Sequence, residues 1–251
     1  MDALSTELFV ALLGALWAAA VLYATSGHGG ATAYLALFGL WGMLPAQMKP
    51  LALVMNIVVA GTGAVRLWRA GAMPQALLAP LLLGSIPCAY LGGLVTLPAT
   101  TYRGLLGACL LVAAVRLWLP TESAGARRQW PAWAFVVVGA VLGLLSGLTG
   151  IGGGIFLSPL LVLGRLEEPR RTAAASAVFI VVNSLVGLVA QAKSGGLAQL
   201  PAALPVVVVV VFVGGLLGSF LAARKLAPTG LKRALGVVLV VSGVTLLSEA
   251  L

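Results

Sequence analysis

The chain has 251 residues, of which 61% are hydrophobic and only 8% are charged, with a net charge of +9. Its mean hydropathy is +1.12, and so few charged residues exclude a soluble globular domain of this size. Long continuous apolar runs, in place of alternating polar and apolar residues, exclude a membrane β-barrel. The basic residues are scattered through short loops, a pattern typical of anchoring in a membrane and not of nucleic-acid binding. The composition therefore predicts an all-α, polytopic membrane protein that contacts membrane lipids and no nucleic acid.

Apolar segments fill most of the chain and predict ten helices. In chain order they cover residues 7–25, 31–44, 50–68, 75–96, 102–119, 131–149, 151–164, 172–192, 202–222 and 231–249. A helix that spans a bilayer needs about 20 residues. The second and seventh segments are shorter than this, and each follows a glycine cluster. We therefore expect each to form half of a broken hairpin, which either re-enters or spans the membrane.

Two glycine clusters precede these short segments. The first reads Ser-Gly-His-Gly-Gly over residues 26–30, and the second reads Thr-Gly-Ile-Gly-Gly-Gly over residues 149–154. Because glycine has no Cβ, backbone N–H groups in such a run can face a cavity, and a helix that starts there adds a positive dipole end that favours an anion. Paired breaks at matching positions indicate the binding site of a transporter. Close packing of helices through small residues is the alternative explanation of the same pattern.

The two halves of the chain resemble each other. The glycines of the first cluster match those of the second at a constant offset, and later matches keep nearly the same spacing, among them Gly63 with Gly187 and Arg69 with Lys193. We interpret this ordered series as an internal duplication. The predicted organisation is a first transmembrane repeat over residues 1–120, a cytoplasmic linker over 121–130 and a second transmembrane repeat over 131–251.

The basic residues predict how the repeats are oriented. If each half crosses the membrane an odd number of times, the second repeat is inverted, and 12 of the 15 basic residues fall on one face. The three on the other face are Lys49, Arg103 and Lys193. An even number of crossings divides them 9 against 6, so the positive-inside rule favours two inverted repeats with both termini outside the cytoplasm. Lys49 and Lys193 are then interpreted as interfacial anchors whose stems lie along apolar surface.

The predicted substrate site collects both glycine clusters and polar residues within the apolar segments. His28, the single histidine, either donates a hydrogen bond to an anion and titrates during transport, or faces water at a helix end. Asn56 and Asn183 either bind substrate or hold two helices together. The candidate substrate-binding residues are His28, Gly29, Gly30, Asn56, Gly152, Gly153, Gly154, Ser158 and Asn183. Weaker candidates, because hydroxyl side chains in such helices often bond to their own backbone, are Thr32, Ser176, Ser184 and Gln191.

Acidic residues are missing from the middle of every apolar segment. This argues against a carboxylate proton relay and against binding of a metal cation. A site of amides and hydroxyls in a basic protein favours a small anion, so we predict an anion transporter without metal or cofactor. A channel-like or cation-handling permease is the alternative. An intramembrane hydrolase, with Ser158 and His28 as its catalytic pair, is an alternative of another class, but the sequence around Ser158 lacks the glycine–serine–glycine context of such enzymes, and we expect no enzyme.

Residues 144–161 read Leu-Leu-Ser-Gly-Leu-Thr-Gly-Ile-Gly-Gly-Gly-Ile-Phe-Leu-Ser-Pro-Leu-Leu. This stretch resembles the signature of the TauE/SafE sulfite exporter family, also called the toluene sulfonate uptake permease family. The stretch from Thr172 to Asn183 is similar to the family's second-half pattern, whereas the first cluster has a shorter glycine run than the family. The resemblance implies a multi-pass transporter of the bacterial inner membrane that moves sulfite, sulfoacetate or another organosulfonate. Transport would proceed by alternating access, and a homodimer is an assembly that the sequence leaves open.

Overall fold

A computed structural model describes residues 5–118, 128–223 and 229–250 of the chain, and throughout these ranges the regular elements are helices. Each of the ten α-helices overlaps one predicted apolar segment. The predicted linker at 121–130 lies mostly outside the described residues. The elements are α1 (Thr6–Thr25), α2 (Ala31–Leu40), α3 (Pro45–Arg69), α4 (Gln75–Leu94), α5 (Ala99–Trp118), α6 (Ala132–Thr149), α7 (Gly154–Leu163), α8 (Pro169–Lys193), the 3-10 helix η1 (Gly196–Gln199), α9 (Leu204–Ala223) and α10 (Thr229–Ser248).

Within the described ranges, six helices are long and apolar enough to cross a membrane, namely α1, α3, α4, α6, α8 and most of α9. The prediction of a polytopic helical membrane protein is therefore confirmed. Helices α2 and α7 have only 10 residues each. Such a helix is about 15 Å long, whereas the hydrocarbon core of a bilayer is about 30 Å thick. Each short helix therefore covers only part of the membrane depth.

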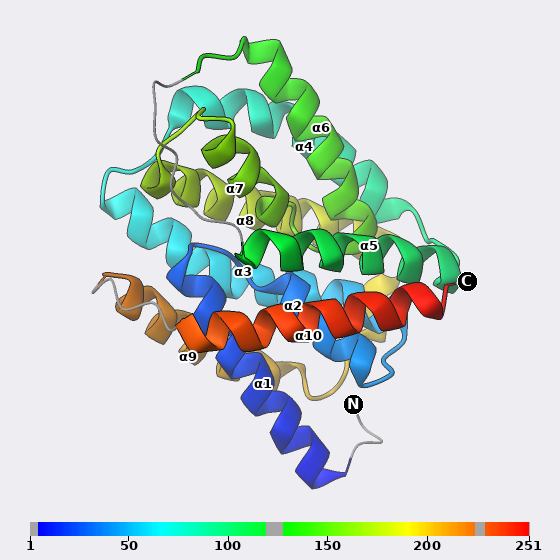
Figure 1. The fold of residues 1–251 in the computed structure, drawn as a ribbon. Coiled ribbons are helices and arrows are strands. Elements are labelled where there is room, and N and C mark those ends of the chain that lie inside the picture. The colour runs from blue at the N-terminus through cyan, green and yellow to red at the C-terminus, as the bar shows by residue number, and fades with distance from the viewer. Residues whose placement is uncertain (1–4, 119–127, 224–228, 251) are drawn as a thin grey trace.

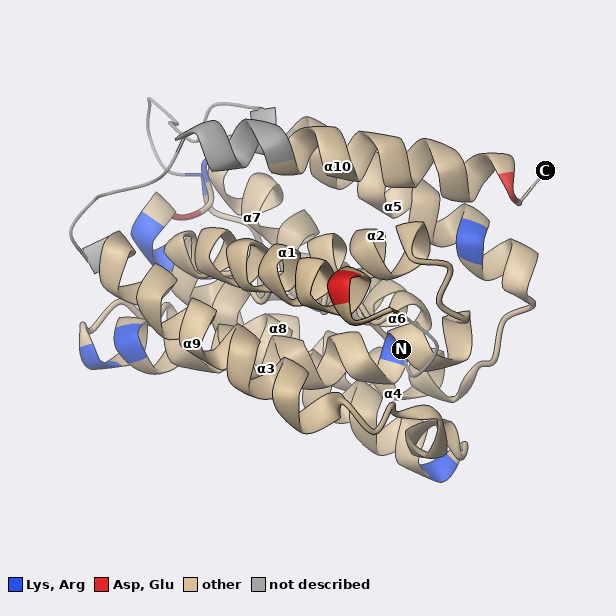
Figure 2. Cartoon of the chain, turned by 90° about the horizontal axis from the view of Figure 1, so that it is seen from below, with Lys and Arg blue, Asp and Glu red and all other residues tan. Residues whose placement is uncertain are grey.

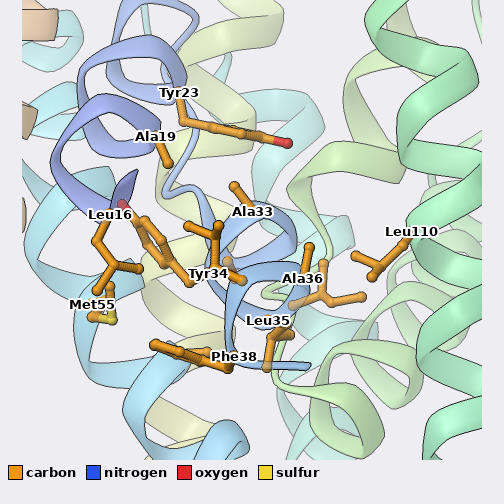
Figure 3. Packing of buried hydrophobic residues seen from close by; sticks show 14 of the residues in the cluster. Leu16, Ala19, Tyr23, Ala33, Tyr34, Leu35, Ala36, Phe38, Met55 and Leu110 are labelled. Carbon is orange, nitrogen blue, oxygen red and sulfur yellow. The ribbon is translucent and has the colours of Figure 1, made fainter. Parts of the chain in front are cut away.

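Helix α2 is enclosed by the protein over most of its length. All of its residues from Ala31 to Phe38 are buried, and Figure 3 shows their side chains between α1, α3 and α5, with Leu16, Met55 and Leu110 as neighbours. A helix that is apolar all round belongs in an interior. Non-helical backbone at membrane depth is tolerated only where protein or a watery cavity surrounds it. The first hairpin, α1 with α2, meets this requirement by burial.

Helices of the first half pack against helices of the second half. The main pairs are α4 with α6, α1 with α9, α5 with α10 and α3 with α8 (Figure 1). Exchanging the halves turns the α1–α9 pair into the α6–α4 pair and leaves the α3–α8 and α5–α10 pairs unchanged. Helices α5 and α10 run antiparallel, since Arg103 near the start of α5 pairs with Glu249 beyond the end of α10 at 3.1 Å. This packing agrees with an internal duplication, while the inversion of the repeats across a membrane stays a prediction.

The described basic residues gather at two ends of the bundle, and Figure 2 shows their segments toward opposite sides. Hydrogen bonds join the loops of one end. The backbone N–H of Arg128 donates to the carbonyl of Arg165 at 2.8 Å, and the side chain of Arg170 donates to the carbonyl of Ala70 at 3.5 Å. We call this the arginine-rich end. The basic residues of this end whose side chains the structure describes are Arg66, Arg69, Arg128, Arg165, Arg170 and Arg171. The opposite end carries Lys49, Arg103 and Lys193.

Candidate functional site

The two glycine loops meet at Asn56, which lies near the middle of α3. Its side chain is fully buried. The Oδ1 atom accepts a hydrogen bond from the N–H of Ala31 at 3.2 Å. The Nδ2 atom donates to the carbonyl of Ile151 at 3.1 Å and to the Oγ of Ser184 at 3.4 Å. One amide therefore connects the first loop, the second loop and α8.

Glycine is required where the loops approach this amide. A Cβ on Gly29 would overlap Oδ1 of Asn56, and a Cβ on Gly152 would lie 2.7 Å from its Nδ2. Helices α2 and α7 begin at the same place, after left-handed N-cap residues Gly30 (φ 95) and Gly153 (φ 74). The positive ends of both helix dipoles therefore lie at the junction of the loops.

The backbone N–H groups of the predicted glycines have no hydrogen-bond partner among the described residues. This holds for the N–H groups of Gly29, Gly30, Gly152, Gly153 and Gly154. Helix starts generally leave such donors without an internal partner. Five N–H donors from two loops, together with two helix starts, form an arrangement that can bind an anion. Whether these residues bind substrate stays a prediction.

His28 connects the first loop to the second hairpin. Its Nε2 lies 2.8 Å from the Oγ of Ser158 on α7, and that oxygen lies 2.8 Å from the Oγ of Ser176 on α8. The other ring nitrogen, Nδ1, lies 3.0 Å from the carbonyl of Ser26. This chain of polar groups joins segments from both halves of the protein, so His28 and Ser158 belong to the same junction as Asn56.

The His28–Ser158 contact also has the geometry of a nucleophile and its base, which a hydrolase would need. The void beside it, lined by Tyr23, Gly29 and Ile180 among others, has a volume of only about 10 Å³. A void of that size holds at most one water molecule, since a water needs about 10–15 Å³. This void has no room for an acyl group in this conformation, and the contact joins the two hairpins.

Asn183 makes no hydrogen bond to the other predicted site residues among the described parts of the chain, although the next residue, Ser184, bonds to Asn56. The Nδ2 of Asn183 donates to the carbonyl of Phe179 in its own helix at 2.8 Å, and its buried Oδ1 has no hydrogen-bond partner among the described residues. The structure therefore brings together every predicted site residue except Asn183. A role of Asn183 in substrate binding stays a prediction that no contact supports.

Sequence reasoning missed Lys49, because its interpretation as an interfacial anchor is wrong. The side chain is only 6% exposed, and its Nζ donates to the carbonyls of Gly92 and Gly93 at 3.4 and 3.3 Å. One signal could have found it. Lys49 precedes Asn56 by seven residues, or two helical turns, and residues at this spacing share a helix face.

The bundle consists mostly of helices able to span a membrane, and it encloses two short helices whose glycine-rich starts meet inside the protein. This architecture is that of a multi-pass membrane transporter. The chain belongs to the sulfite exporter TauE/SafE family, whose model matches residues 11–246. It is also 33% identical over 243 residues to the probable membrane transporter protein y4hK of Sinorhizobium fredii. That match covers 95% of this chain and 98% of the relative. No solved structure matches the chain. Membership of this family agrees with residence in the bacterial inner membrane.

Proposed function

We propose that this transporter moves a small sulfur-containing anion, sulfite or an organosulfonate such as sulfoacetate. The observation that carries the proposal is the junction of the two glycine loops, where unpaired N–H groups of both halves meet two positive helix ends. A sulfonate or sulfite group offers several oxygen acceptors and a negative charge to such donors. The name of the matching family, sulfite exporter, supports the sulfur chemistry.

Transport proceeds by alternating access in this proposal. The junction void of about 10 Å³ is too small for any of these anions, so the loops must separate before an anion binds between them. At the junction, Asn56 bonds to Ile151 and Ser184, and His28 bonds to Ser158, so that these contacts join the first half of the chain to the second. Rocking of the two repeats, which we propose to be inverted, would break and remake these bonds around the anion.

A matched pair of glycine variants tests the proposal. Gly152→Ala places a Cβ 2.7 Å from the amide of Asn56 at a φ of +86, whereas Gly71→Ala carries a similar φ of +67 with nothing within 4 Å. Both variants bear the same kind of backbone strain, but only the first obstructs the junction. In proteoliposomes we expect uptake of labelled sulfite or sulfoacetate by the wild type and by Gly71→Ala, and loss of uptake by Gly152→Ala.

Two results would contradict the proposal. Uptake by Gly152→Ala at the wild-type rate would exclude the junction as the anion site. Failure of the wild type to move any sulfur anion, combined with uptake of a simple cation such as Rb⁺, would instead favour the cation permease.

A further inference from the structure

A cavity of about 420 Å³ opens at the end of the bundle opposite the arginine-rich end. The start of α3, the loop between α4 and α5, and the segment from the end of α8 through η1 surround it. Most of its walls are apolar, among them Leu44, Val95 and Leu148, and its main polar side chains are Lys49, Tyr102 and Gln191. The cavity is therefore large enough for a small organic molecule and contains one cationic side chain.

Lys49 lies at this cavity without an acidic partner. The ion pairs in the described part of the chain are Arg103–Glu249 and Arg171–Glu167, and neither includes Lys49. Among the described residues, its Nζ donates hydrogen bonds to the carbonyls of the last turn of α4, at 3.3–3.4 Å. A helix C-terminus attracts a cation, but a buried ammonium without a counter-ion still carries a large desolvation cost. An anion in the cavity would supply the missing charge.

The same lysine lies against the second glycine cluster. A Cβ on Gly150 would lie 3.2 Å from the Cγ of Lys49 and 3.2 Å from its carbonyl oxygen. Tyr102, which also lines the cavity, donates a hydrogen bond from its hydroxyl to the carbonyl of Thr149 at 2.9 Å. Two helical turns of α3, about 10 Å, separate Lys49 from Asn56. Lys49 therefore stands between the cavity and the loop junction.

The second repeat has no such cation in the matching place. Gly27 in the first cluster corresponds to Gly150 in the second, and a Cβ on Gly27 would lie 3.1 Å from the carbonyl of Ala173 on α8. The two contacts are equivalent, but one involves a lysine and the other an alanine. Because alanine is sufficient for this packing contact in one repeat, packing does not explain the lysine in the other. The charge of Lys49 therefore has a role in only one half of the protein.

We propose that this cavity is an anion-binding vestibule, in which Lys49 binds the acidic head of a small organic anion before the anion reaches the glycine junction. This inference rests on the proposed function and adds the site of entry and the substrate class. One cation among apolar walls suits a monoanion with a single sulfonate head and a short apolar body. Within the proposed class of sulfur anions, the vestibule therefore favours such an organosulfonate over sulfoacetate or sulfite, which can carry a second negative charge. A strongly hydrated dianion such as sulfate would lose more hydration than one lysine replaces.

The test compares charge-removing variants in purified, nanodisc-embedded protein by isothermal titration calorimetry. The probes are benzenesulfonate and ethanesulfonate, with sulfate for comparison. We expect Lys49→Gln to weaken sulfonate binding at least about tenfold, the size expected for losing a charge-assisted hydrogen bond, and Lys49→Arg to retain most of it. The matched control is Lys193→Gln, which removes an exposed charge at the same end and should change the affinity less than about twofold, as exposed charges contribute little.

A second variant keeps the test decisive if Lys49→Gln does not fold. Thr96→Trp narrows the cavity from an exposed lining position and leaves Lys49 unchanged, so we expect it to abolish binding. Wild-type affinity in either folded variant, or equal losses in Lys49→Gln and Lys193→Gln, would overturn the vestibule. If the wild type binds sulfonates through Lys49 but does not transport them, the proposed function fails and the vestibule stands.

Discussion

A single amide side chain, that of Asn56, connects both glycine loops. The change Asn56→Ala removes its hydrogen bonds to Ala31, Ile151 and Ser184 and leaves a buried N–H and a buried carbonyl unpaired. Each group left in this way costs about 1–3 kcal/mol. We therefore expect Asn56→Ala to lower the melting temperature of the purified protein clearly and to abolish anion uptake, measured by thermal unfolding and in proteoliposomes.

Asn183 provides the matched control for this prediction. Its Oδ1 is buried without a hydrogen-bond partner among the described residues, so Asn183→Leu removes an unsatisfied acceptor at similar volume. We expect the melting temperature to stay unchanged or to rise, because replacing an unpaired polar group by an apolar one is nearly neutral or stabilising. Lost uptake at an unchanged melting temperature would mean that Asn183 contacts substrate in another conformation.

The contact between His28 and Ser158 joins two hairpins and can be measured by a double-mutant cycle. The variants are His28→Ala, Ser158→Ala and their combination. Because the two side chains meet at 2.8 Å across the junction, we expect a coupling of about 1 kcal/mol in the free energy of unfolding, within the range found for contacting residues. Additive effects within about 0.3 kcal/mol would show that the contact contributes nothing to closure of the loops.

Most residues of this junction could be predicted from the sequence. The glycine clusters stand out because two unusual runs precede two short segments, and His28 and Ser158 lie in or just after them. Lys49, which lies beside the junction, was harder to recognise, since a lysine near the end of an apolar segment is usually an anchor. Its spacing of seven residues from Asn56 was the one signal in the sequence, and its contact with the last turn of α4, far along the chain, shows that it points inward.

At the scale of elements, the existence of the helices and several of their starts were predictable, such as those of α2 and α4, but the starts of α3 and α8 were not. Helix α3 begins at Pro45, and α8 begins at Pro169, several residues before the apolar segments that predicted them. Proline fits the first helical position because its missing N–H is not needed there. Polar residues then follow, such as Gln47 and Lys49, so a prediction based on apolar residues misses the first turns of the helix. The short η1 helix has no apolar signal and was missed.

The crossing of α4 with α6 depends on small residues. Gly139, Gly143 and Gly147 recur every fourth residue along α6, and a Cβ on Gly143 would overlap the carbonyl of Ser85 on α4. Small residues at this spacing let helix backbones approach closely in a membrane. We expect Gly143→Val to push the helices apart and to destabilise the protein by more than about 3 kcal/mol, as overpacking of a backbone contact does.

Gly14 on α1 is the control for this crossing, because a Cβ there meets nothing within 4 Å. Gly14→Ala should be neutral or stabilise its helix by up to about 1 kcal/mol. Thermal unfolding and the monodisperse yield after purification compare the two variants. If Gly143→Val melts as the wild type does, the α4–α6 crossing is looser than the backbone distances indicate.

For the whole molecule, the division of basic residues between the two ends predicts which end faces the cytoplasm. The arginine-rich end brings together residues that are distant in sequence, such as Arg66, Arg128 and Arg170, whereas Lys49, Arg103 and Lys193 lie at the other end. The positive-inside rule then assigns the arginine-rich end to the cytoplasm. The C-terminus lies at the opposite end, because Glu249 pairs there with Arg103.

This assignment predicts the location of both termini. An alkaline phosphatase reporter, which is active only outside the cytoplasm, should be active when fused to either terminus, and a fluorescent reporter that folds only in the cytoplasm should stay dark at both. A fusion after Gly71, in the loop between α3 and α4 at the arginine-rich end, should give the reverse result and serves as the internal control. Cytoplasmic signals from both termini would reverse the predicted orientation in the membrane. The cavity beside Lys49 would then open to the cytoplasm, and the same lysine would collect anions for export in place of uptake.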